Sequence, residues 1–216
     1  ANGASSGAGI GGGDSYGTHT PADTINITGG IIKASNGYGS GYGIGSGYNN
    51  TDGTITIDGN PVIRANAIMD INSSSSNWKG ILFIGSGEEQ KKGQVYGTPT
   101  APDDYTVEAG ETLTIPDGAS LTVAAGKTMT NKGTVAISEN GTGTFTNNGI
   151  IRNEGTLPAS IGGNGKILSP FPNVTIASIT QTTTYNGQPV TPTPTVTTTA
   201  SPGASLTLDT DYTLTY

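Results

Sequence analysis

The chain has 216 residues, of which 32% are hydrophobic and only 12% are charged, and its formal net charge is −7. Nine lysine and arginine residues are too few to neutralise a nucleic-acid backbone, and the lack of cysteine excludes disulfide scaffolds, thiolate zinc sites and thiol nucleophiles. The 35 glycines, together with many threonines and asparagines, favour short strands and tight turns instead.

Short apolar segments recur along the first hundred residues. The repeats lie about 30 to 40 residues apart: 24–29 recurs as 54–59, 31–35 as 62–66, and 10–13 as 44–47 and then as 84–87. Insertions fall between these segments and leave their pattern intact. This arrangement predicts β-strands that stack in parallel on their counterparts in the next repeat.

A tighter series of apolar residues extends from about residue 107 to residue 168. Three sets of positions recur at intervals of 22 or 24 residues: Leu113, Val135 and Leu157; Met129 and Ile151; Leu121, Phe145 and Ile167. The turns at 131–133, 147–149 and 153–155 contain Asn and Gly, which indicates left-handed or bridging backbone conformations. The period is that of a coil with three short strands per turn, in which the members of each set stack.

The sequence changes character after residue 168. Residues 169–173 (SPFPN) are predicted to form a linker, because proline at this density ends a strand stack. Thr-rich strands without a repeat period are expected beyond it, at 174–176, 183–185, 195–197, 206–208 and 212–214. The C-terminal part is therefore predicted to be a separate module.

Two parts of the sequence resemble known families of bacterial surface proteins. The segments 8–13 (AGIGGG) and 24–30 (TINITGG) resemble the glycine-rich right-handed β-helix repeats of cell-surface and adhesin-like proteins. The segments 184–189 (TYNGQP) and 206–213 (LTLDTDYT) resemble the Ig-like modules that occur in tandem on such proteins. Because further strands usually follow the Asp-Tyr-Thr motif in that family, the resemblance implies that the last module is incomplete.

These features predict an all-β protein. We expect a parallel β-helix (solenoid) over residues 1–168, with a glycine-rich ladder at 1–100 and a tighter ladder at 107–168. The linker 169–173 and a partial Ig-like β-sandwich at 174–216 follow. The right hand of the coil is implied by the resemblance alone. The sequence leaves open whether the two ladders form one continuous solenoid.

Carboxylates are weighed as catalytic candidates, because polysaccharide-degrading enzymes also use parallel β-helices. Asp52 and Asp58 lie in turn-like sequence and are predicted to be solvated, whereas Asp14 follows a glycine run that lacks the repeated aspartates of a calcium-binding motif. Asp70 is the remaining candidate, since Arg64 and Lys79 lie nearby in the sequence and a lyase needs a base and a cation beside an acidic sugar. His19 is the one histidine, which excludes a multi-histidine metal site. We therefore predict no catalytic residue, no metal and no cofactor.

Aromatic residues on predicted loops are the candidates for carbohydrate contact. Tyr38, Tyr42 and Tyr48 alternate with glycine, and Trp78 lies in a long polar insertion. Exposed rings of this kind can stack on sugar faces. The alternative is that the four rings cover the ends of the strand stack or fill gaps left by glycines.

The expected function is that of a non-catalytic segment of a secreted or surface-displayed bacterial protein, acting in adhesion, display or glycan contact. The alternative is a β-helical polysaccharide lyase or glycoside hydrolase-like enzyme acting on an acidic polysaccharide. The expected partners are host or environmental glycans or proteins and further domains of the same polypeptide. No apolar run approaches the ~18 residues that cross a bilayer, so no membrane contact is expected within this sequence. An export signal and any anchor are expected to lie outside it.

Overall fold

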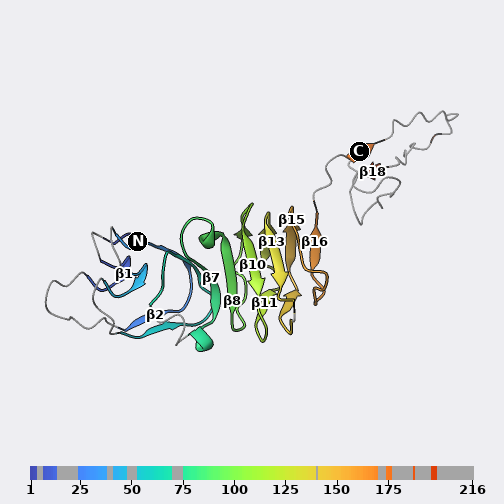
Figure 1. Ribbon diagram of the computed structural model, residues 1–216. Helices are drawn as coiled ribbons and strands as arrows, with labels where there is room; N and C mark the ends of the chain where they lie inside the picture. The colour runs from blue at the N-terminus through green and yellow to red at the C-terminus, as the bar shows by residue number, and fades with distance from the viewer. Residues whose placement is uncertain are drawn as a thin grey trace. The chain divides into compact units, whose positions relative to one another are not determined.

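The structure, a computed structural model, describes residues 1–3, 7–13, 24–37, 41–47, 53–69, 75–139, 141–169, 174–176, 187 and 196–198. The chain divides into two compact units, Ala1–Leu168 and Ser169–Tyr216. Strands and two short 3₁₀ helices make up the regular structure of the described residues, so the predicted all-β class is confirmed (Figure 1).

The elements of the first unit are, in chain order, β1 (Ile10–Gly11), β2 (Ile25–Ile27), β3 (Ile31–Ala34), β4 (Ile44–Gly45), β5 (Ile55–Ile57), β6 (Val62–Ala65), η1 (Ser75–Asn77), β7 (Gly80–Ile84), η2 (Glu89–Lys91), β8 (Lys92–Tyr96), β9 (Tyr105–Val107), β10 (Thr112–Ile115), β11 (Ser120–Val123), β12 (Thr128–Asn131), β13 (Thr134–Ile137), β14 (Thr144–Asn147), β15 (Ile150–Asn153) and β16 (Lys166–Leu168). Four smaller sheets are wholly parallel, in the orders β1-β4, β2-β5, β11-β14 and β16-β15-β12-β9. The strands of each series therefore return to the same few sheets in turn.

One six-stranded sheet, here called the shared sheet, contains strands of both predicted series in the order β3-β6-β7-β8-β10-β13. Strands β3, β6 and β7 are parallel to one another, and so are β8, β10 and β13. The pair β7-β8 is antiparallel, so the strand direction reverses once, at the middle of the sheet. Figure 1 shows β7, β8, β10 and β13 side by side across this junction.

The predicted pairing of the first series is mostly confirmed. Strand β2 pairs with β5, β3 with β6 and β1 with β4, each in the register expected from the repeats. The prediction that 84–87 stacks as a third copy of 10–13 and 44–47 is wrong, because Ile84 pairs with Ala65 in the shared sheet. Ile44 instead forms its next bridge with Ile68, which lies only a few residues after β6. The Ile-Gly pattern at 84–85 therefore belongs to a different sheet.

The predicted stacking of the second series is confirmed for Leu113 on Val135, Met129 on Ile151 and Leu121 on Phe145. Ile167 is the exception, because it pairs with Ile151 rather than following Phe145. The reason is a shortened last turn. The chain advances twelve residues from the bridge position Thr134 to Thr146, but only six from Thr156 to Gly162, their partners in the next turn.

Of the two conformations predicted for the Asn-x-Gly turns, the left-handed one is not adopted by their glycines, since Gly133, Gly149 and Gly155 are absent from the residues with positive φ. A Cβ atom on Gly133 would lie 2.4 Å from the carbonyl oxygens of Glu108 and Glu111. A Cβ on Gly149 would meet two carbonyl oxygens of the preceding turn at the same distance. Glycine is needed there because successive turns approach closely.

The two series have hydrophobic cores on opposite faces of the shared sheet. In-register Val62 and Ile81 belong to the core of the second series, whereas their neighbours Ile63 and Leu82 belong to the core of the first. Successive side chains of a strand point to opposite faces, so β6 and β7 are buried on both sides. This explains the continuous apolar run in β7, since a strand covered on both faces needs no polar alternation.

The described part of the second unit contains one antiparallel pair, β17 (Val174–Ile176) with β18 (Val196–Thr198). A strand at 174–176 was predicted, and β18 overlaps the strand predicted at 195–197. The other predicted strands of this module, at 183–185, 206–208 and 212–214, lie outside the described residues. The Ig-like assignment therefore stays a prediction.

Candidate functional site

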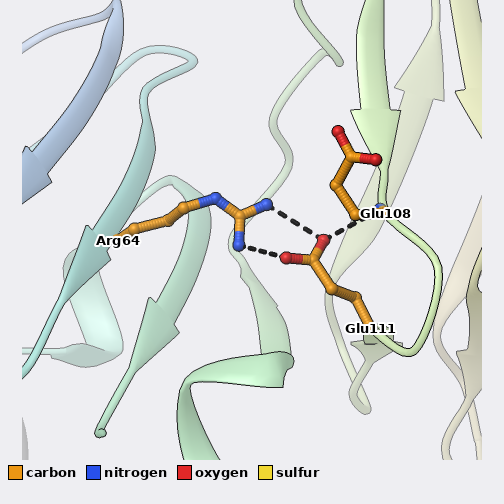
Figure 2. Close-up of polar contacts among 3 residues, drawn as sticks. All are labelled: Arg64, Glu108 and Glu111. Atoms are coloured by element: carbon orange, nitrogen blue, oxygen red, sulfur yellow. Dashed lines mark hydrogen bonds and ion pairs between the residues drawn. The ribbon is translucent and has the colours of Figure 1, made fainter. Parts of the chain in front are cut away.

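A buried ion pair joins the two series at the shared sheet. Arg64, in β6, reaches the carboxylate of Glu111, which directly precedes β10 (Figure 2). Arg64 Nη1 donates to Glu111 Oε1, and Nη2 donates to Oε2 at 3.0 Å. The backbone N–H of Glu108 also donates to Glu111 Oε2, at 3.0 Å. The two ionic side chains are 17% and 10% exposed, so this bidentate pair is largely removed from water.

Phe83 completes the setting of the guanidinium group. The Arg64 Cζ atom lies 4.1 Å from the centroid of the Phe83 ring, which is within the range of a cation–π contact. The same ring covers Gly93, where a Cβ would come within 2.5 Å of ring atoms. Arg64 is therefore held between an aromatic ring and a carboxylate and serves the packing of the two series.

Beside this ion pair lies a groove, here called the Ile31 groove, made of two hollows that share Ile31. Ile31 is 65% exposed. One hollow, of about 330 Å³, is lined besides Ile31 by Thr28, Gly29, Gly30, Asn60, Thr100, Ala101, Pro102, Asp103 and Lys127. The other, of about 230 Å³, is lined by Lys33, Val62, Arg64, Asp104, Tyr105, Thr106 and Glu108. The groove thus lies where the first strands of one series meet the start of the other.

Tyr105 is the most buried polar side chain of the groove lining. The residue is 3% exposed, and its hydroxyl group is buried without a hydrogen-bond partner in the described structure. Burial raises the pKa of the phenol; the Arg64 charge opposes this rise, and the Glu111 and Glu108 charges add to it. The phenol therefore stays neutral and can both donate and accept a hydrogen bond.

A further cleft, of about 690 Å³, lies between β13, β14 and the segment 156–162. It forms where the last turn is shortened. The residues that connect β13 to β14 have no equivalents in the next turn to stack on them. Its lining contains serine, threonine, glycine and apolar residues but no charged side chain. The cleft thus has no group for acid–base chemistry.

The aromatic residues predicted to contact carbohydrate are not gathered on one surface of the described chain. Trp78 was expected on an exposed loop, but it is 2% exposed, and its indole N–H donates to the carbonyl of Ile55 at 3.3 Å. Its ring lies 6.2 Å from that of Tyr96, measured between centroids. Tyr42 is partly buried and packs against the core of the first series. Tyr38 and Tyr48 lie outside the described residues.

Trp78 thus corrects the expectation of an exposed ring. The expectation rested on the polar insertion that precedes Trp78. Its ring instead packs in the core of the first series, where the indole N–H donates to a backbone carbonyl. The arrangement of Trp78 and Tyr42 agrees with the alternative weighed from the sequence, in which these rings cover the strand stack.

Arg64 and Lys79, the two cations near Asp70 in the sequence, form ion pairs with other residues. Arg64 is paired with Glu111, and Lys79 forms an exposed ion pair of 3.2 Å with Asp58. The N–H of Gly59 and the Lys79 ammonium lower the pKa of Asp58, which is exposed, as predicted. Four other residues weighed from the sequence lie outside the described residues: Asp14, His19, Asp52 and Asp70.

The described residues offer neither a cluster of metal ligands nor a membrane-spanning helix. No group of three or more His, Cys, Asp or Glu side chains is placed so that it could hold a metal ion. No helix there has the length and apolar character needed to cross a membrane.

Apart from Arg64, which had been weighed only as a cation near Asp70, the groove residues had not been singled out as site candidates in the sequence. Arg64 and Glu111 are 47 residues apart, and no local motif connects them. Tyr105 has no repeat partner of its own type, since Met129 occupies the next position in its sheet. The one usable signal was a charged residue, Arg64, within an otherwise apolar strand.

Comparisons of the chain with protein-family models, with curated proteins and with solved structures find no match.

Proposed function

We propose that this chain is a non-catalytic segment of a secreted or surface-displayed bacterial protein, in which a right-handed parallel β-helix presents a glycan-binding surface. Adhesion or display at the cell exterior is its role. The observation that carries the proposal is the shared sheet, which joins two stacks of strands into one scaffold and leaves a groove open at their junction.

The topology supports a coil of one hand throughout. At the junction of β7 and β8 the strand direction reverses, and the core changes to the other face of the sheet. Each change alone would invert the sense of winding about the coil axis, so the two together preserve it. Because crossovers between parallel strands are right-handed in about 98% of cases, we infer a right-handed coil on both sides of the junction. A crystal structure of the full chain tests this directly.

The chemistry of the described side chains favours display over turnover. Arg64 and Lys79, the cations of the lyase alternative, are engaged by Glu111 and Asp58. Strand stacks are stabilised by interfaces between neighbouring repeats and typically offer extended binding surfaces. A glycan-binding scaffold therefore accounts for these observations without a catalytic group.

The test is to apply the full chain to an array of neutral, acidic and amino-sugar glycans, and to incubate it with the same glycans in solution. We expect saturable binding to at least one class and no new reducing ends. New reducing ends that disappear in Asp70→Asn would establish the enzyme alternative. A chain that binds nothing on the array would contradict glycan contact.

A further inference from the structure

We propose that the Ile31 groove binds an uncharged oligosaccharide, with the hydroxyl group of Tyr105 as a contact at its floor. This inference rests on the proposed function and names both the site and the class of ligand. Tyr105 is not one of the four aromatic residues predicted from the sequence to contact carbohydrate, and none of those four lines the groove.

The form of the groove suits an extended ligand. Its two hollows, of about 330 and 230 Å³, both have Ile31 in their lining, and together they fall within the usual size range of ligand sites. Ile31 is 65% exposed. Its apolar side chain can pack against the C–H face of a sugar ring while the hollows receive the hydroxyl groups on either side.

The charges of the lining point to a ligand without net charge. Three cations and three carboxylates line the two hollows: Lys33, Arg64 and Lys127 with Asp103, Asp104 and Glu108. Lys127 pairs with Asp103 at 3.3 Å, and Arg64 pairs with Glu111, so Lys33 faces Asp104 and Glu108 and the lining has no excess of cations. Carboxylates accept hydrogen bonds and ammonium groups donate them, and a sugar hydroxyl does both. A polyuronate would instead need an excess of cations.

Tyr105 is the observation that points to a ligand. Its hydroxyl is buried and has no partner in the described structure, and it faces the charges of Arg64 and Glu108, which also line the smaller hollow. A buried polar group without a partner is costly, and the great majority in folded proteins have one. Tyr105 lines the smaller hollow, so a sugar hydroxyl bound there would supply that partner once the lining side chains move aside to uncover the phenol oxygen.

Two substitutions separate binding from folding. Tyr105→Phe removes only the unpartnered hydroxyl, so the thermal midpoint should stay the same or rise, because nothing bonded is lost. Affinity for the ligand should fall about fivefold, as expected for one neutral hydrogen bond. Tyr96→Phe, at a half-buried tyrosine that lines neither hollow, is the matched control. Ile31→Asp changes an exposed side chain and should abolish binding without unfolding the chain, whereas Leu168→Asp, at another exposed apolar residue, should not.

The measurement is titration calorimetry of the full chain with the neutral tetrasaccharides cellotetraose, xylotetraose and mannotetraose, and with tetragalacturonate. We expect binding of at least one neutral tetrasaccharide and none of tetragalacturonate. The inference is overturned if no neutral tetrasaccharide binds, if tetragalacturonate binds as well as they do, or if Tyr105→Phe and Ile31→Asp leave affinity unchanged. If both variants still bind glycans on the array, the groove is not the binding site, and the proposed function stands.

Discussion

Asn131 illustrates how single residues link successive turns. It is fully buried in β12, and its Nδ2 donates to Asn153 Oδ1 and to the carbonyl of Thr156, both at 2.8 Å. Its Oδ1 is buried without a partner. The cause is the residue on its other side in the sheet, which is Val107, so the row of asparagine side chains begins at Asn131.

Asn131→Asp should therefore destabilise the first unit strongly. The change removes both donated hydrogen bonds and places a carboxylate against two oxygen acceptors in a buried position. We expect the free energy of unfolding to fall by about 3 kcal/mol or more in urea denaturation. Asn148→Asp, at an exposed asparagine in the following turn, is the control and should change it by less than about 0.5 kcal/mol. Equal urea midpoints for the two variants would rule out this account.

At the scale of the strand and its turn, the spacing between successive turns explains where glycine is required. Gly133 lies directly over the carbonyl groups of Glu108 and Glu111 in the preceding turn, and the backbone there has no room for a Cβ. Gly29 is different, because nothing lies within 4 Å of the position of its Cβ, and its φ is not positive. The two glycines look alike in the sequence but meet different surroundings.

Gly133→Ala should cost about 1 to 3 kcal/mol of stability, because rigid backbone atoms must move to admit the methyl group. Gly29→Ala should be nearly neutral. Thermal unfolding of both variants, followed by circular dichroism, makes the comparison. If Gly133→Ala melts at the same temperature as Gly29→Ala, close approach of the turns is not what requires glycine at this position.

At the scale of the whole first unit, Arg64 and Glu111 connect two series of strands that run in opposite directions in one sheet. The pair bridges 47 residues of sequence and is mostly buried. Removing one partner leaves the other charge buried and uncompensated, which typically costs 3 to 5 kcal/mol. The cost of removing both should be much smaller than the sum of the two single changes.

A double-mutant cycle of Arg64→Met and Glu111→Met in urea denaturation tests this coupling. We expect a strongly non-additive result, with the double variant more stable than at least one single variant. The exposed pair of Lys91 with Glu88, 2.8 Å apart, supplies the control, and Glu88→Ala should leave the urea midpoint unchanged. Additive effects at Arg64 and Glu111 would mean that the pair does not couple the two series.

The repeats alone determined much of the strand stacking. Leu113, Met129 and Leu121 were each placed on the correct partner one turn later, because the alternation of apolar residues and their period are local properties of the chain. The same reasoning failed for Ile167, since it assumed a constant turn length and the last turn is shorter.

Only the tertiary structure decided the reversal at β7 and β8, the burial of Trp78 and the pairing of Arg64 with Glu111. The pairing of β7 with β8 places strands of the two series in one sheet, and the strand order of that sheet determines which distant side chains meet. A repeat period carries no information about such meetings, because it relates each residue to its own counterpart and not to the residues of another series. For this reason the composition and periods of the sequence predicted the class and most of the pairing. The junction between the series, where the Ile31 groove lies, followed from the fold alone.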